Sequence, residues 1–286
     1  MTRSARIAFQ GELGAFSEEA IRNIDERAEA VPCRDFIDVA QAVESGDVDA
    51  GMLPIENTLA GSVVGSYDVL QACGSLHVVA ETVVEIHHCV LTVRGAFLEA
   101  LTTVESHPVA LAQCTRWLRA HASIAVRAAY DTAGAARDVA ARGDVRAAAI
   151  AGRRAAARYD LEILAADIED RSDNQTRFLM VSRAPRALDA GAHARTALLV
   201  TTPNVPGALL RVLEPLARNQ INMSKLESRP ADEPWHYRFF LELDHTAGDP
   251  SLAAAIAELR GRTESLRVLG TYQRCVAGRA GTGAAH

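Results

Sequence analysis

Short apolar segments and amphipathic segments alternate through the first 183 residues, and this alternation restricts the fold more than any other feature of the sequence. Arg6–Phe9 and Ala50–Leu53 have the length and composition of strands, whereas Ser17–Arg27 has apolar residues at helical spacing. Strands separated by helices of about 10–15 residues are typical of a parallel sheet flanked by helices. The other predicted strands are Leu76–Val93, Thr103–Ser106, Ile124–Ala128, Ala147–Ile150 and Phe178–Ser182, and the other predicted helices are Asp35–Ser45, Gly61–Cys73, Pro108–His121, Thr132–Arg142 and Arg153–Tyr159.

The strand-like segment Leu76–Val93 is long enough to carry the chain from one lobe to another. The alternation therefore fits either one doubly wound sheet or two smaller α/β lobes with a cleft between them. In open α/β sheets, ligands bind beyond the carboxyl ends of the strands, so polar residues that follow strands are the first candidates for a site.

A loss of apolar periodicity at Arg183–Arg195, a stretch that contains Pro185 and Gly191, predicts a linker. Beyond it, the expected elements follow the order βαββαβ of a ferredoxin-like domain. They are strand Thr196–Thr202, helix Gly207–Arg218, strands Ile221–Arg229 and Trp235–Leu243, helix Pro250–Arg260 and strand Leu266–Tyr272. The sequence thus predicts two domains, 1–183 and 195–274, and a frayed Gly/Ala-rich tail after Cys275.

Charge and cysteine content argue against a nucleic-acid-binding protein, a membrane protein and a disulfide-rich protein. The 286 residues carry 36 acidic and 30 basic side chains, a formal net charge of −6, whereas a protein that binds nucleic acid needs a basic face. No uncharged span of about 20 residues could cross a membrane, and no apolar signal-peptide region follows the start. Five scattered cysteines without C-x-x-C spacing indicate reduced thiols. We therefore expect a cytoplasmic protein whose partners are neither nucleic acid nor membrane.

Gly11–Ser17 lies between a predicted strand and a predicted helix and carries two glycines. Glycine lets the backbone approach a ligand, and the N–H groups at a helix start attract an anion. An ordinary tight turn, with Ser17 as the helix cap or in the first turn, explains the same residues. The spacing is not G-x-G-x-x-G, which disfavours a nicotinamide cofactor.

Leu53–Thr58 places polar residues after a buried strand. Glu56, Asn57 and Thr58 are expected beyond the carboxyl end of that strand, where open α/β sheets bind ligands. Capping of a helix by Asn57 or Thr58 is the alternative explanation.

Asp173–Phe178 precedes the predicted strand Phe178–Ser182 and combines an amide, a hydroxyl and a guanidinium. Arg177 offers a planar fork that suits a carboxylate, and the Thr176 hydroxyl can donate or accept a hydrogen bond. A solvated loop is the alternative explanation of this segment.

Two segments with histidine are assigned structural roles. His87 and His88 are adjacent, so on a strand they face opposite sides and cannot share a metal ion. In Ser106–Cys114 the histidine and the cysteine lie two helical turns apart, too far for a nucleophilic pair, and Ser106 is a better candidate for a helix cap or an anion contact. No metal site is expected.

In the second domain, Gly207–Leu209 opens the first predicted helix and Glu227–Pro230 ends the second predicted strand. Small residues at a helix start allow a ligand or a second subunit to approach closely. Ordinary helix packing explains them as well.

Taken together, these segments resemble the prephenate dehydratase family, whose members carry a C-terminal ACT regulatory domain. The resemblance covers residues 6 to 274 and rests on six motifs in order: Gly11–Ser17, Leu53–Thr58, Ser106–Cys114, Asn174–Phe178, Gly207–Leu209 and Glu227–Pro230. Two residues depart from the family's pattern. Phe16 stands where a tyrosine is often found, and Asp131 stands where an uncharged Ser or Asn is expected, so we expect no direct substrate contact at Asp131.

The resemblance implies an α/β catalytic domain of two lobes, similar to periplasmic binding proteins, with the active site in the cleft and a ferredoxin-like βαββαβ ACT domain after it. It implies the decarboxylating dehydration of prephenate to phenylpyruvate, water and carbon dioxide in L-phenylalanine biosynthesis, without metal or organic cofactor. Two alternatives remain. An arogenate dehydratase accepts an amino group in place of the keto group, and a cytosolic amino-acid sensor would bind phenylalanine without catalysis.

The resemblance also implies roles for individual residues. Thr176 is the essential hydroxyl, with Asn57 or Glu56 in the same network, and all three are implied catalytic residues. The implied substrate-binding residues are Gly14, Ala15, Ser17, Thr58, Ser106, Asn174, Arg177 and Phe178. L-Phenylalanine is expected as an allosteric effector at a subunit interface of the ACT domain, in a homodimer or homotetramer. The implied effector residues are Gly207, Ala208, Leu209, Glu227, Ser228 and Arg229.

Overall fold

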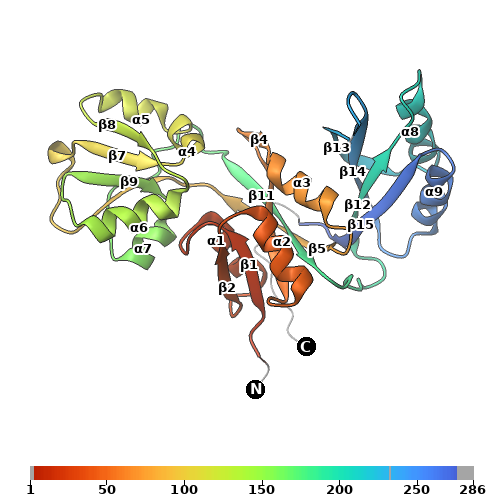
Figure 1. The fold of residues 1–286 in the computed structure, drawn as a ribbon, viewed down its shortest axis with the longest axis horizontal. Helices are drawn as coiled ribbons and strands as arrows, with labels where there is room; N and C mark the ends of the chain where they lie inside the picture. The colour runs from red at the N-terminus through yellow and green to blue at the C-terminus, as the bar shows by residue number, and fades with distance from the viewer. Residues whose placement is uncertain (1–2, 232, 276–286) are drawn as a thin grey trace. The chain divides into compact units, whose positions relative to one another are not determined.

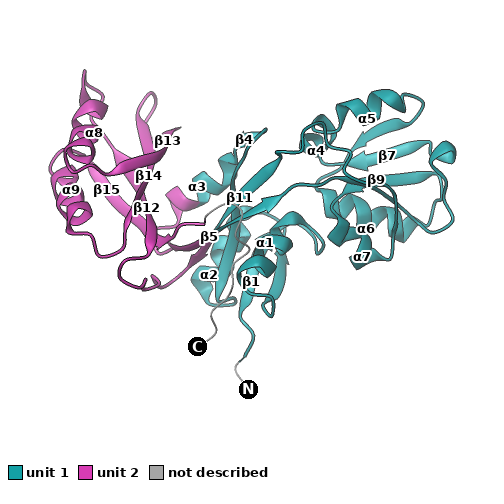
Figure 2. Ribbon diagram, turned by 180° about the vertical axis from the view of Figure 1, so that it is seen from behind, with its two compact units in different colours: residues 1–69, 82–179, 277–286 teal, residues 70–81, 180–276 magenta. Residues whose placement is uncertain are grey.

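The computed structural model describes residues 3–231 and 233–275 and divides them into two compact units (Figures 1 and 2). The first unit takes in the described residues up to Val69 together with Thr82–Leu179. The second takes in Leu70–Glu81 and the described residues from Met180 onward. Among the residues described, no helix has the length and apolarity needed to span a membrane. The predicted frayed tail after Cys275 lies outside the described residues.

The first lobe of the first unit is built on a sheet with the strand order β2-β1-β3-β11-β5, to which β4 adds by pairing with β3. Strand β1 pairs in parallel with both β2 and β3. The strands are β1 Arg6–Gln10, β2 Glu29–Cys33, β3 Ala50–Asn57, β4 Gly61–Ser62, β5 His77–Glu85 and β11 Gln175–Ser182, and the helices are α1 Phe16–Ile24, α2 Phe36–Ser45 and α3 Val64–Ala72.

The second lobe has the strand order β10-β6-β9-β7-β8. Strands β7, β8 and β9 are parallel, as predicted, but β6 runs antiparallel to β9 and β10, so the sheet is mixed. Strand β9 is fully buried and consists of alanines and one isoleucine, and the small side chains let α6 pack closely on it. The elements are β6 Cys89–Thr92, a 3₁₀ turn at Leu98–Ala100, β7 Thr103–Ser106, α4 Pro108–Ala112, α5 Thr115–Ala120, β8 Ala125–Ala128, α6 Thr132–Arg142, β9 Ala147–Ala151, α7 Arg153–Tyr159 and β10 Glu162–Ala165.

The second unit contains the predicted βαββαβ arrangement. Its sheet has the antiparallel order β13-β14-β12-β15, and α8 and α9 cover one face around a core that includes Leu198, Val212 and Leu241 (Figure 1). The elements are β12 His193–Thr201, α8 Ala208–Arg218, β13 Asn222–Pro230, β14 Tyr237–Thr246, α9 Pro250–Arg260 and β15 Ser265–Gln273. Strand β12 begins at His193, within the stretch predicted as linker.

Several predicted elements end elsewhere because tertiary hydrogen bonds set their limits. The predicted strand Leu76–Val93 is interrupted at residues 86–88, where the backbone N–H of Ile86 donates to Asn174 O (2.8 Å). The predicted helix Pro108–His121 is two helices, because the backbone N–H groups of Thr115 and Arg116 turn to the carboxylate of Asp170 (3.0 and 2.8 Å). Strands β2, β4 and β10 were not predicted, and β4 takes the first residues of the predicted helix Gly61–Cys73 because they pair with the end of β3.

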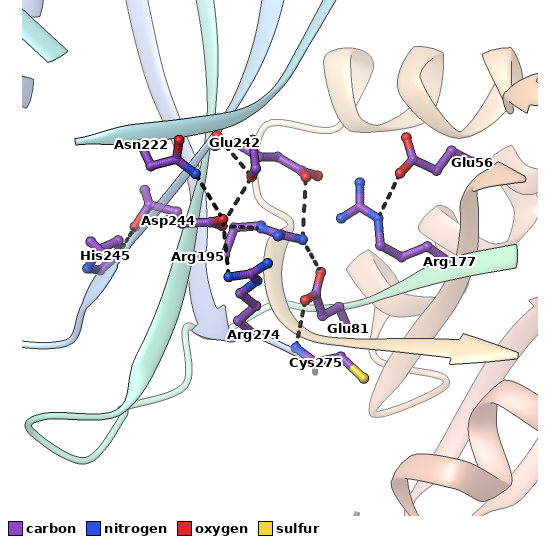
Figure 3. Close-up of polar contacts among 12 residues, drawn as sticks. Glu56, Glu81, Arg177, Arg195, Asn222, Glu242, Asp244, His245, Arg274 and Cys275 are labelled. Atoms are coloured by element: carbon purple, nitrogen blue, oxygen red, sulfur yellow. Dashed lines mark hydrogen bonds and ion pairs between the residues drawn. The ribbon is translucent and has the colours of Figure 1, made fainter. Parts of the chain in front are cut away.

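Strand β5 contributes an acidic residue to a buried ion-pair cluster in the second unit (Figure 3). Arg195 on β12 places its guanidinium 2.8 Å from Glu81 Oε2 and 2.7 Å from Asp244 Oδ1, with Glu242 Oε2 at 3.7 Å. The Arg195 side chain is 9% exposed and that of Glu81 is 1% exposed, so solvent screens these charges little. Burial alone would raise the pKa of Asp244, but the hydrogen bond and charge of Arg195 hold it below its usual value.

Gly270 on β15 allows the backbone of β5 to lie directly against the sheet of the second unit. A Cβ atom at this position would overlap the carbonyl oxygen of Val78. A few residues further along β5, Glu81 Oε1 accepts a hydrogen bond from the backbone N–H of Cys275 (2.7 Å). Both contacts hold the segment Leu70–Glu81 within the second unit.

The Arg195→Met substitution removes the cation that faces the buried carboxylates of Glu81 and Glu242 and the largely buried one of Asp244, and it should lower the free energy of unfolding by about 3–5 kcal/mol. Calorimetry of the full chain measures the loss. Arg218→Met is the matched control, because the Arg218–Glu258 pair is 58% and 40% exposed and should contribute about 0–1 kcal/mol. Equal losses in the two variants would contradict a stabilising role for the cluster.

Candidate active site

Asn57, the last residue of β3, connects three segments that are far apart in the sequence. Its Nδ2 donates hydrogen bonds to Asn174 Oδ1 (2.8 Å) and Thr176 Oγ1 (2.9 Å). Its Oδ1 accepts from Gln113 Nε2 (3.3 Å) and from two backbone N–H groups of the turn that follows β3 (2.9 and 2.8 Å). The structure therefore brings Asn57, Asn174 and Thr176 together, whereas the resemblance implied only Asn57 beside Thr176 and gave Asn174 as a substrate contact.

The side-chain amide of Gln113, from the second lobe, hydrogen-bonds to two other members of this network. Its Oε1 lies 3.0 Å from Asn174 Nδ2 and 3.0 Å from His88 Nε2. Asn174, Thr176 and His88 are 1%, 9% and 2% exposed, so these polar groups depend on one another rather than on water. Gln113 lies in the quoted motif Ser106–Cys114, but sequence reasoning did not select it, because the predicted continuous helix gave no reason to expect a break there.

Pairing of β3 with β11 positions the network. The backbone N–H of Thr58 donates to Gln175 O (2.9 Å), and the Thr58 hydroxyl donates to Asp173 O (2.9 Å). Asn57 and Thr176 consequently lie within regular strands, not in the loops that the sequence predicted before Phe178 and after Leu53.

Glu56 and Arg177 are brought together with each other but not with Thr176. Arg177 Nε lies 3.2 Å from Glu56 Oε1, and Figure 3 shows this pair. Side chains alternate between the two faces of a sheet, so Glu56 and Arg177 occupy the face opposite to Asn57 and Thr176. The implied membership of Glu56 in the Thr176 network is therefore not found.

The Gly11–Ser17 segment forms a turn that makes hydrogen bonds with residues of the second lobe. The backbone N–H of Glu12 donates to Asp131 Oδ2 (2.9 Å), and Tyr159 OH donates to Leu13 O (2.7 Å). Gly14 has a φ of +93°, and a Cβ atom there would lie 2.9 Å from the Cα of Ala155. Burial raises the pKa of Asp131, although the backbone N–H groups that it accepts from oppose this. Asp131 thus contacts the chain rather than standing free at the cleft.

The start of α1 is already occupied by groups of the chain itself. The backbone N–H of Gly14 donates to Glu18 Oε2 (2.7 Å), Ala15 is the helix cap, and Ser17 lies in the first turn. The predicted role of Ser17 as the cap is wrong, whereas its alternative place in the first turn is confirmed.

Ser106 is buried and does not cap a helix. Its hydroxyl donates to Ile150 O (2.6 Å), which ties β7 to β9, whereas His107 caps α4 by accepting from the backbone N–H of Val109 (3.3 Å). The predicted cap at Ser106 is therefore wrong. Phe178, an implied substrate contact, is 2% exposed and belongs to the core.

Within the described residues, His87, Asp167 and Glu169 could hold a metal ion, since their ligand atoms lie within 4.8 Å of one another. These groups are engaged with the protein, however. Glu169 accepts from the backbone N–H of His88 and hydrogen-bonds to His87 Nδ1, both at 2.9 Å, and Arg153 NH2 lies 2.8 Å from Asp167. The hydrogen bond to Glu169 raises the pKa of His87 despite its partial burial.

Comparison with known proteins identifies the family. The prephenate dehydratase model matches residues 7–186, and the ACT domain model matches residues 196–261. The chain belongs to the prephenate dehydratase family. It is 38% identical over 277 residues to arogenate dehydratase/prephenate dehydratase 2, chloroplastic, of Arabidopsis thaliana, a match that covers 93% of this chain and 72% of the relative. It is also 38% identical over 282 residues to arogenate dehydratase 2 of Petunia hybrida, a match that covers 93% of this chain and 71% of the relative.

Two solved structures are similar over nearly the whole chain. The prephenate dehydratase of Arthrobacter aurescens in complex with L-Phe has a TM-score of 0.87 at 31% identity and covers 94% of this chain and 90% of that one. GqqA, described as a novel type of quorum quenching acylase, has a TM-score of 0.87 at 34% identity, and the match covers 96% of this chain and 100% of GqqA. The predicted prephenate dehydratase resemblance, fold class and lyase activity are confirmed.

The ACT domain of this prephenate dehydratase carries the implied effector residues at one end but on two faces. Beyond the end of β12, Gly207 is the N-cap of α8, and Ala208 and Leu209 are its first residues. Strand β13, which runs in the same direction as β12, ends there with Glu227–Pro230. On β13, Ser228 pairs with Phe239 on the helix-covered face, whereas Glu227 pairs with Phe240 on the other face. A single chain does not bring all six residues together.

Proposed function

We propose that this chain converts prephenate to phenylpyruvate, water and carbon dioxide. Family membership supports the reaction, and the observation that carries it is the buried Thr176 hydroxyl, which accepts a hydrogen bond from the half-buried amide of Asn57 at 2.9 Å. In the reaction, the carbon–carboxylate bond breaks, its electron pair enters the ring, and hydroxide leaves with a proton as water. Aromatisation drives these steps, so no metal or organic cofactor is needed.

The hydrogen bond from Asn57 determines what Thr176 can do. Because Thr176 Oγ1 accepts from an amide N–H, its own proton is free to be donated to the departing hydroxyl. An aliphatic hydroxyl is a weak acid, so the contribution is an oriented hydrogen bond, worth about 2.7–4 kcal/mol in comparable sites. An amide cannot take up the hydroxyl proton, which argues against Thr176 as the nucleophile of an acylase.

The dianionic substrate requires local positive potential, because the chain as a whole has a net charge of −6. We propose Ala15, Ser17, Thr58 and Asn174 as substrate contacts, which the position of the first three around the turn before α1 and the end of β3 and the contact of Asn174 with Asn57 support. Gly14 would join them only if substrate displaced Glu18 from its N–H group. The Glu56–Arg177 pair lies on the other face of the sheet, and we infer that Arg177 acts by holding β3 beside β11.

An arogenate dehydratase is the second candidate, because the Arabidopsis and Petunia relatives carry that name. Arogenate differs from prephenate by an amino group in place of the keto group. Parallel assays with both substrates decide between them: a larger kcat/KM with prephenate supports the first candidate, and a larger value with arogenate supports the second.

Thr176→Ala should lower kcat for phenylpyruvate formation about 100- to 1000-fold, because the donor to the leaving hydroxyl is lost. Thr176→Ser keeps the hydroxyl and should retain most of the activity. Thr102→Ala, which removes an exposed hydroxyl bonded to Arg146 O, is the control and should behave like the wild type. A wild-type chain without turnover on either substrate would overturn the function, and a Thr176→Ala variant with normal kcat would overturn the role of Thr176.

We further propose that L-phenylalanine regulates the enzyme through the ACT domain, in a homodimer or homotetramer. The Arthrobacter relative was solved with L-Phe, and the division of the effector residues over two faces supports a site completed by a second chain. The proposed domain limits are 1–183 and 195–274. A cytoplasmic location is proposed from the five free cysteines, although the Arabidopsis relative is chloroplastic.

Gly207→Val should weaken inhibition by L-phenylalanine at least about tenfold, because a branched side chain at the start of α8 obstructs the close approach of the effector. Gly248→Val is matched to it, since both glycines belong to the second unit and have positive φ, +76° and +87°. Inhibition curves of the two variants provide the measurement. If L-phenylalanine inhibits both variants alike, the effector site does not include Gly207.

A further inference from the structure

His88 lies where the chain leaves β5, and its ring is enclosed by the first unit. The side chain is 2% exposed, and its ring packs edge-to-face on Phe16 with 5.7 Å between centroids and an 82° angle between planes. The backbone N–H of His88 donates to Glu169 Oε2 (2.9 Å), which fixes the main chain at this point. The ring therefore has a defined place and little freedom to turn.

The hydrogen bond between His88 and Gln113 has a defined direction. Gln113 Oε1 accepts from Asn174 Nδ2 (3.0 Å) and can only accept, so His88 Nε2, also at 3.0 Å, must carry the proton. Its Nδ1 is buried without a partner among the described residues, as expected for the unprotonated nitrogen of a neutral ring. Burial also lowers the pKa of His88, which favours the neutral form at physiological pH.

The direction of this bond controls how Gln113 faces the catalytic network. With Oε1 held by His88 and Asn174, the Nε2 group of Gln113 must point to Asn57 Oδ1 (3.3 Å). A reversed amide would set two oxygens against each other at Asn57 and two N–H donors against each other at His88. The Nε2–H donor of His88 therefore excludes the reversed orientation of the Gln113 amide.

We propose that His88 is a positioning residue for the dehydration, because its Nε2–H group orients the Gln113 amide that supports Asn57 and, through it, Thr176. The proposal rests on the proposed function. His88 itself does not contact the reacting atoms, and its effect on the reaction passes through Gln113.

His88→Phe retains a flat ring but has no donor, and it should lower kcat about 10- to 100-fold while KM changes less than about threefold. His88→Gln places an amide N–H at the position of Nε2 and should restore kcat to within a few-fold of the wild type. His87→Gln, at the neighbouring residue whose side chain is 40% exposed, is the matched control and should leave kcat unchanged. His88→Leu serves as a second donor-free variant, and thermal unfolding checks that each variant is folded.

A double-mutant cycle with Gln113→Leu separates positioning from a general packing role. If His88 acts through Gln113, adding His88→Phe to Gln113→Leu should lower kcat less than about threefold further. Equal effects of His88→Phe in both backgrounds, or failure of His88→Gln to restore kcat, would overturn the proposal. A wild-type chain inactive on prephenate and arogenate would instead overturn the proposed function, so the two failures are distinguishable.

Discussion

The side-chain amide of Asn57 is the interaction on which the proposed active site depends. It donates to Asn174 and Thr176 on one side and accepts from Gln113 on the other, so a single residue connects β3, β11 and the break between α4 and α5. A largely buried polar network of this kind is stable only when every member has its partners, and the loss of one leaves several groups unsatisfied. The same requirement fixes the directions of the hydrogen bonds around Thr176.

The network is composed of neutral groups, which suits a reaction in which negative charge appears on a leaving hydroxyl. Amide and hydroxyl dipoles that are already oriented stabilise such charge without reorganising during the reaction. The charged residues of the region lie elsewhere: Glu56 and Arg177 pair on the other face of the sheet, and Glu169 binds the two histidines after β5. The proposed function thus assigns the two faces of the sheet different roles, with the Glu56–Arg177 pair holding the strands and the neutral network acting on the substrate.

Local signals in the sequence predicted elements whose ends are set locally. Helices Thr132–Arg142 and Pro250–Arg260 occur as expected, because Asp131 and Asp249 cap their starts and a glycine follows each. The breaks at residues 86–88 and at Gln113 depend instead on acceptors, Asn174 O and Asp170, that lie far away in sequence. For the same reason the resemblance gave Asn57 or Glu56 as the partner of Thr176 and could not separate the two. That separation follows from strands that extend past Leu53 and begin before Phe178.

The most direct test is the turnover number of Asn57→Asp with prephenate. The substitution keeps the size of the side chain and its acceptor oxygen, but replaces the Nδ2 donor to Thr176 and Asn174 with an acceptor. If the amide organises the site, kcat should fall at least about 100-fold in a variant that remains folded by thermal unfolding. A folded Asn57→Asp variant with kcat within threefold of the wild type would contradict the account.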